Sequence, residues 1–174
     1  RAFGEHPAET WLRLMLETDG KAIFHMPFFN TNFDAVEDLM DREWIVPGLG
    51  DAGAHVSVII DAGWPSFMLS HWVRDEKKMK LATAVHRMTA RAAKVMNLSD
   101  RGVLAPGKRA DINVIDVDRV EERQPEVVQD FPLGKSRLTQ PAAGYLATMV
   151  NGEVIVRNDE HTGNRGGRVL RSNG

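Results

Sequence analysis

The residue whose type and surroundings best suit it to chemistry is Asp51. It ends the apolar run 44–50 and lies in the glycine-rich phrase PGLGDAGAH. A carboxylate placed where a strand ends among small residues can approach a metal ion or a substrate closely, and barrel folds hold catalytic groups at strand ends. An aspartate beside glycine also forms turns by bonding to nearby backbone. From the residues alone, both interpretations of Asp51 stay open.

Three histidines could take part in the same chemistry. His55 lies four residues after Asp51, where an imidazole could bind metal, orient a substrate carbonyl, or simply bond to loop backbone. His25 follows an apolar run and could also end a strand, although a histidine satisfied at the rim of a core is the simpler interpretation. His71 and Asp75 are one helical turn apart, which suits a metal pair, but ordinary surface contacts have the same spacing. We favour the surface contact.

The sequence lacks a complete metal or nucleotide motif. A metal site needs three or more ligands, and the HxH, HExxH and two-His-one-carboxylate spacings are absent. The chain has no cysteine, which excludes thiolate ligands and cysteine catalysis. Neither a GxSxG elbow nor a phosphate-binding GxxxxGK[ST] loop occurs. Any metal would therefore take most of its ligands from outside this chain.

Length and composition describe an ordinary globular chain. It has 174 residues, 43% of them hydrophobic, and a net charge of −2. This length allows one sizeable core, and the near-neutral charge gives no general attraction to nucleic acid or to an anionic membrane. No apolar run approaches the ~18 residues of a membrane span, so we expect a cytoplasmic protein that binds a small molecule. Because the chain opens with Arg1 in what looks like structure, we expect a fragment of a longer protein.

The elements that would position these residues change character near residue 100. Before it, apolar periodicity predicts helices over 7–18, 33–43, 64–73 and 78–98. Apolar runs predict a strand followed by a loop within 21–29, and a strand running into a loop within 44–51. After it, glycine turns and β-branched residues predict short strands. Asn151 and Gly152 suit the type I′ turn of a hairpin over 145–156. The alternation predicts an α/β protein with a parallel sheet.

Several phrases in series resemble the amidohydrolase superfamily: GLGDAGAHV (48–56), MTARAAKVMNL (88–98) and RGVLAPGKRADINVIDVD (101–118). Two later phrases, RLTQPAAGYLATMVNGEVI and EHTGNRGGRVL, resemble the closing segment of its N-acyl-D-amino-acid deacylase branch. The resemblance covers nearly the whole chain. It implies that residues 1–99 are the last βα units of a metal-dependent (β/α)8 hydrolase barrel, or TIM barrel. Residues 100–174 would be the closing strands of a small β-sandwich with a C-terminal tail.

The resemblance also implies roles for individual residues. In that family an aspartate at the end of the last barrel strand binds the metal and handles the proton, and Asp51 is the matching position. Asp51 would take a proton from the metal-activated water as the water attacks the acyl carbonyl, then pass the proton to the departing amine. His55 would contact the substrate or orient a group that binds the metal. Gly50 stands where many relatives carry Ser.

The function so implied is hydrolysis of a linear amide, of the D-aminoacylase kind, with one or two zinc ions. Most zinc ligands would come from a missing upstream half of the barrel, which is then the chain's main partner. One alternative is a cyclic amidase or dihydroorotase-like hydrolase. Another is a noncatalytic fragment that is active only in association with that half. We expect the isolated chain to be inactive and to self-associate, with a homo-oligomer left open and no nucleic acid bound.

Overall fold

The computed structural model describes residues 4–48, 50 and 52–170. The chain divides into two compact units. One compact unit extends to Asp38 and the other begins at Leu39. In the described part of the chain before residue 60, the helices are α1 (Pro7–Glu17) and α2 (Phe33–Met40). Both agree with the helices predicted over 7–18 and 33–43. Among the described residues, no helix has both the length and the apolar content that a bilayer crossing requires.

Helix α1 begins where its sequence provides a start signal. Pro7 occupies the first turn, where its missing N–H costs nothing. The His6 Nδ1 atom accepts a hydrogen bond from the backbone N–H of Ala8, at 3.3 Å. The Glu9 carboxylate accepts one from the backbone N–H of His6, also at 3.3 Å. These reciprocal bonds satisfy two donors that a helix start leaves unpaired.

The strand predicted over 21–29 is wrong. Residues 21–28 have no regular secondary structure, and none of the described residues 4–38 is buried. The apolar side chains of this segment are exposed, from 47% for Phe24 to 81% for Phe29. A strand exists only when another strand pairs with its backbone, and the described residues offer this segment no such partner. The strand predicted over 44–51 is likewise absent from the described residues 44–48 and 50.

The second unit has two helical stretches, each of which changes its winding along its length. The first consists of a 3₁₀ turn (Asp61–Gly63), helix α3 (Trp64–Phe67) and a π-helical segment (Met68–Asp75). The second consists of helix α4 (Leu81–His86), a π-helical segment (Arg87–Arg91) and helix α5 (Ala92–Val95). They agree with the helices predicted over 64–73 and 78–98. Their buried apolar side chains are Met68, Leu69, Trp72, Ala84 and Ala93.

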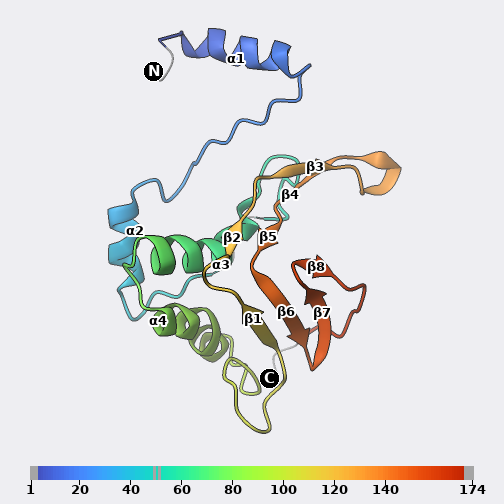
Figure 1. The fold of residues 1–174 in the computed structure, drawn as a ribbon. Helices are drawn as coiled ribbons and strands as arrows, with labels where there is room; N and C mark the ends of the chain where they lie inside the picture. Colours follow the sequence, from blue (N-terminus) through green and yellow to red (C-terminus); the bar gives the residue numbers. More distant parts are fainter. Residues whose placement is uncertain (1–3, 49, 51, 171–174) are drawn as a thin grey trace. The chain divides into compact units, whose positions relative to one another are not determined.

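Strands follow from residue 112 onward, and every described pairing is antiparallel. The main sheet has the order β1 (Ile112–Ile115), β6 (Tyr145–Val150), β7 (Glu153–Arg157), β8 (Glu160–His161), as Figure 1 shows. Two short ladders join β2 (Glu121–Glu122) to β5 (Ala142–Ala143) and β3 (Glu126–Val128) to β4 (Arg137–Thr139). The predicted hairpin is confirmed, because Asn151 and Gly152 turn between β6 and β7 with φ of +53° and +82°.

Polar contacts fasten the first helical stretch to the strands. Ser66 is buried, and its Oγ lies 2.9 Å from the hydroxyl of Tyr145 at the start of β6. Arg74 donates to the carbonyl oxygens of Asp118 at 3.3 Å and Val120 at 2.7 Å. The Val120 side chain is fully buried. The stretch that begins at Asp61 is therefore joined to the strands near its start, at Ser66, and near its end, at Arg74.

Candidate functional site

Asp51, the strongest candidate from the sequence, lies outside the described residues, so its predicted role stays a prediction. We use the name site loop for residues 50–61, of which the structure describes Gly50 and residues 52–61. His55 lies within this loop with an exposed side chain and a φ of +48°. Its carbonyl oxygen accepts hydrogen bonds from the backbone N–H groups of Val58, at 2.7 Å, and Ile59, at 3.1 Å. The loop therefore has ordered turns of its own.

The two ends of the site loop meet. A Cβ atom added to Gly50 would lie 2.6 Å from both the carbonyl oxygen and the Oδ2 atom of Asp61. Only glycine lets two segments approach so closely without displacement. Compact surface loops with adjoining ends are often functional. The residue before Asp51 in the sequence is thus in contact with the residue that begins the 3₁₀ turn.

A segment distant in sequence holds the middle of the site loop. The backbone N–H of Leu138, in β4, donates to the carbonyl oxygen of Val56 at 2.8 Å. Strand β4 pairs with β3, and a two-pronged ion pair between Arg137 and Asp130, at 2.7 and 2.8 Å, braces this hairpin. The Arg137 guanidinium holds the pKa of Asp130 below its ordinary value. In Figure 1 the β3–β4 hairpin extends away from the main sheet.

The other predicted candidates do not join the site loop in a metal site. The His71 ring stacks on Phe67 with a centroid distance of 4.6 Å, and the Asp75 carboxylate pairs with Arg74 at 2.7 Å. Hydrogen bonding from Arg74 lowers the pKa of Asp75. These contacts agree with the surface role that we favoured for His71 and Asp75. His25 is exposed in the first unit.

The described residues do not fit a metal by themselves. Within residues 4–48, 50 and 52–170, no three His, Asp or Glu side chains come together as a metal site would require. A neutral imidazole such as that of His55 can supply one ligand at most. A metal bound at this loop would need Asp51 and ligands from outside the described residues.

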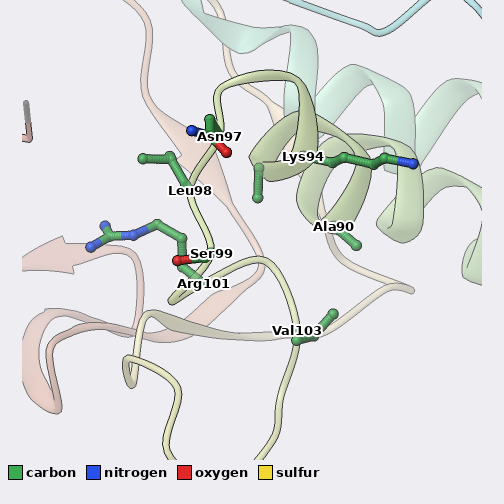
Figure 2. Close-up of a pocket in the computed structure, with 8 residues that line it drawn as sticks. Ala90, Lys94, Asn97, Leu98, Ser99, Arg101 and Val103 are labelled. Carbon is green, nitrogen blue, oxygen red and sulfur yellow. The ribbon is translucent and has the colours of Figure 1, made fainter. Parts of the chain in front are cut away.

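A hollow of about 280 Å³ lies beyond helix α5 and contains none of the candidate residues. Its polar lining includes Lys94, Asn97, Ser99 and Arg101. In Figure 2 the Lys94 and Arg101 side chains extend in opposite directions, so the two cations do not converge on a common anion. Arg101 instead pairs with Asp100 at 3.1 Å and Asp111 at 2.9 Å. We assign no binding role to this hollow.

Sequence analysis missed the ion-pair network of which Arg101 is part. Asp100 accepts from both Arg101 and Arg109, and these bonds lower its pKa to about 2. Asp111 accepts from the backbone N–H of Asn151, at 2.8 Å, at the hairpin turn. The network joins the loop after α5 to the main sheet. The two aspartates and two arginines of the segment 100–111 were the available signal.

Sequence analysis also missed Asp61. Its signal was the apolar run VSVII immediately before it, which resembles the context of Asp51. In the structure Asp61 is exposed and begins a 3₁₀ turn. Its contact with Gly50 brings it to the end of the site loop that precedes Asp51 in the sequence.

Comparison with known proteins relates this chain to one protein family. The amidohydrolase family model matches residues 10–156. N-acyl-D-glutamate deacylase from Alcaligenes xylosoxydans xylosoxydans is 38% identical over 110 residues, which are 62% of this chain and 20% of that protein. Dihydroorotase from Desulforapulum autotrophicum is 36% identical over 100 residues, or 54% of this chain and 22% of that protein. The chain spans about a fifth of the length of these relatives.

Solved structures give the same result. A crystal structure of D-aminoacylase matches with a TM-score of 0.50 and 31% identity, over 63% of this chain and 21% of that one. A second D-aminoacylase structure, which concerns the role of that enzyme's binuclear metal center, matches with the same values. The structural match covers 63% of this chain, and the family model matches residues 10–156. This protein belongs to the amidohydrolase family.

Proposed function

We propose that this chain is the C-terminal portion of a metal-dependent amidohydrolase that hydrolyses the linear C–N amide bond of N-acyl-D-amino acids. The observation that supports this proposal most directly is the 38% identity to N-acyl-D-glutamate deacylase. The match to solved D-aminoacylase structures supports the same substrate class. The dihydroorotase match supports a cyclic amide substrate as the second candidate.

The proposed architecture assigns the last βα units of a (β/α)8 barrel to residues 1–99 and strands of a small β-sandwich to residues 100–174. The described order of elements supports it, because helices come first and antiparallel strands follow from Ile112. Parallel strands pair with segments distant in sequence, so this architecture makes residues 1–99 dependent on the upstream half. That half is the partner we propose, with a homo-oligomer as the alternative source of pairing.

The chemistry we propose for this chain centres on Asp51. Amide hydrolysis requires that water lose a proton as it attacks the acyl carbonyl, and that the departing amine gain one. A single carboxylate can do both, first as base and then as acid. His55 lies four residues further along the same loop, where its imidazole could contact the substrate. We propose zinc as the metal, with Asp51 as one ligand and the others supplied from outside the described residues.

The first experiment compares three compounds as substrates of the full-length protein. We expect hydrolysis of N-acetyl-D-glutamate to acetate and D-glutamate, and little turnover of N-acetyl-L-glutamate or dihydroorotate. Turnover of dihydroorotate alone would favour the second candidate. Turnover of none of the three would contradict both.

Replacement of Asp51 tests its assigned role. In Asp51→Asn the amide keeps the shape of the side chain but cannot take up a proton, so we expect kcat to fall by ~10²–10⁴-fold with the fold intact. Asp34→Asn, an exposed change in helix α2, is the matched control and should retain normal kcat. Near-normal turnover in Asp51→Asn would assign Asp51 to turn formation only.

Metal content tests the location of the ligands. We expect elemental analysis of the desalted full-length protein to find zinc, and analysis of the isolated 174-residue chain to find none, because the described residues hold no three-ligand group. One zinc per isolated chain would instead mean that this segment and its own copies complete the site.

A further inference from the structure

The turn between β6 and β7 contains an asparagine followed by a glycine, a pair that is prone to deamidation. In this reaction the backbone nitrogen of the following residue attacks the Cγ atom of the asparagine side chain. Glycine has no side chain to obstruct that attack. Asn151 and Gly152 are both exposed, so water has access to the turn. Sequence and exposure together make Asn151 a candidate modification site.

The reaction needs only water as a co-reactant. A bond forms between the Gly152 nitrogen and the Asn151 Cγ atom, while the bond from Cγ to the amide nitrogen Nδ2 breaks. The Gly152 nitrogen gives up its hydrogen, ammonia leaves, and a cyclic succinimide remains. Water then opens the succinimide at either of its carbonyl groups. The product is aspartate or isoaspartate, with a carboxyl group in place of the amide.

Three consecutive residues, which we name the turn clamp, hold the groups that this reaction must move. The Arg109 Nη1 atom donates to the Asn151 Oδ1 atom at 2.8 Å. The Ala110 carbonyl oxygen accepts from the backbone N–H of Gly152 at 2.9 Å. The Asp111 carboxylate accepts from the backbone N–H of Asn151 at 2.8 Å. The attacking nitrogen and the attacked side chain are therefore each bonded to the clamp.

The turn clamp has bonds of its own that order it. The Arg109 Nε atom donates to the Asp100 carboxylate at 3.0 Å, and the Arg109 backbone N–H donates to the Asp100 carbonyl oxygen at 2.8 Å. The Asp111 carboxylate pairs with Arg101 at 2.9 Å. The side chains of Arg109 and Asp111 are only 31% and 27% exposed. The clamp thus restrains the turn from an ordered base.

We propose that Asn151 is a deamidation site and that the turn clamp protects it in the native fold. Ring closure removes the hydrogen of the Gly152 nitrogen and so breaks its bond to Ala110. The Asn151 side chain must also turn toward that nitrogen and away from Arg109. The reaction therefore proceeds from an opened turn, at a rate set by how often the turn opens. This inference is independent of the proposed function.

The first test follows loss of ammonia from Asn151 in the full-length protein, kept in mildly alkaline buffer and analysed by peptide mapping with mass spectrometry. The reference is an unstructured peptide with the sequence of residues 147–156. We expect the folded protein to react more slowly than the peptide by about tenfold or more, and at the rate of the peptide in strong urea. Mapping separates Asn151 from a second Asn-Gly pair, Asn173–Gly174, which lies outside the described residues.

The second test removes one bond of the turn clamp. Arg109→Met keeps an unbranched side chain but cannot donate to Asn151, so we expect deamidation there to become about fivefold faster. Asp100→Ala is the matched control, because it removes an ion pair of Arg109 and leaves the bond to Asn151 in place. Its rate should rise by less than about twofold. The comparison of wild type with the peptide decides the proposal even if Arg109→Met fails to fold.

Asn97 is an internal control in every sample. It is exposed, and its φ of +54° nearly equals the +53° of Asn151. It is followed by Leu98, whose side chain obstructs attack by the backbone nitrogen. We therefore expect Asn97 to keep its amide while Asn151 reacts. Equal reaction at both positions would contradict the assignment of the site to the Asn-Gly pair.

Deamidation of Asn151 in the folded wild-type protein at the rate of the peptide would overturn the proposal. A slower reaction in Arg109→Met would also overturn it, because the guanidinium would then activate the amide carbonyl instead of restraining it. Equal acceleration in Arg109→Met and Asp100→Ala would remove the role given to the bond between Arg109 and Asn151. No reaction at Asn151 even in strong urea would exclude the site.

Discussion

Residues 112–161 pair with one another as antiparallel strands, whereas the described residues 4–48 form no strand. The later segment pairs with itself: β6 and β7 are joined by the Asn151–Gly152 turn, and β1 pairs with β6. The earlier segment has apolar runs of comparable quality, yet none of its residues is buried and none pairs as a strand. Antiparallel hairpins find their partners locally, whereas parallel strands depend on distant segments. The contrast shows which part of this fold is specified by nearby residues.

The largest change in stability should come from a substitution in the later segment, residues 112–161. Gly144, between β5 and β6, has a φ of +89°, and a Cβ there would lie 2.6 Å from the backbone N and Cα of Val120. We expect Gly144→Ala to lower the free energy of unfolding by roughly 2–4 kcal/mol, since it combines backbone strain with overpacking. Denaturant unfolding would measure the change.

A matched glycine separates the two causes. Gly107 has a similar φ of +83°, but nothing lies within 4 Å of a Cβ placed there. Gly107→Ala should therefore cost only the backbone strain, about 1–2 kcal/mol. Equal losses in the two variants would show that the close approach to Val120 contributes nothing.

The exposed apolar side chains of the earlier segment should make the isolated chain self-associate. Phe28 and Phe29 are 72% and 81% exposed in a segment that contains several other exposed apolar side chains. Contiguous exposed apolar surface favours association. We expect sedimentation velocity to show oligomers of the isolated chain, and the double change Phe28→Ser/Phe29→Ser to shift them toward monomer.

The control for this experiment is an exposed apolar residue from the later segment. Leu133 is 98% exposed near the tip of the β3–β4 hairpin. Because Phe131, at 39%, is the one other large apolar residue exposed among the described residues of this turn, Leu133→Ser should leave the sedimentation profile unchanged. The same shift in both variants would mean that exposure of any single apolar residue suffices.

The same contrast explains what could be predicted from the sequence. Helix α1 and the Asn151–Gly152 hairpin were predicted correctly because their start and turn signals lie within a few residues. The strand over 21–29 was predicted wrongly because an apolar run says nothing about the presence of a partner. Asp61 was missed because its contact with Gly50 depends on loop closure, which no spacing rule describes. The role of Asp51 stays a prediction.

Between the two segments, Arg87 is a buried charge on the second helical stretch. It is 8% exposed, and its Nη1 atom has no hydrogen-bond partner among the residues that the structure describes. A buried polar nitrogen without an acceptor costs its desolvation free energy, and a buried guanidinium costs more than a neutral group. We expect Arg87→Met to raise the free energy of unfolding of this chain by roughly 1–3 kcal/mol. Urea unfolding would measure the change.

Lys94→Met is the control for Arg87, because Lys94 is exposed on the same stretch and its replacement should change stability by less than about 0.5 kcal/mol. A loss of stability in Arg87→Met would contradict the prediction. In the full-length protein, an opposite sign would support an acceptor for this guanidinium on the proposed upstream half.

The smallest effect should come from Asp100, whose bonds join the loop after α5 to the sheet side. Hydrogen bonds from Arg101 and then Arg109 lower its pKa from 3.8 to about 2. Since the folded-state pKa is the lower one, this carboxylate stabilises the fold fully above pH 3.8 and loses that contribution as the pH falls toward 2. Because the Asp100 side chain is 45% exposed and therefore screened by solvent, the loss should be slight. Urea midpoints across this pH window should fall less steeply in Asp100→Asn than in wild type, whereas parallel curves would mean that the network adds no net stability.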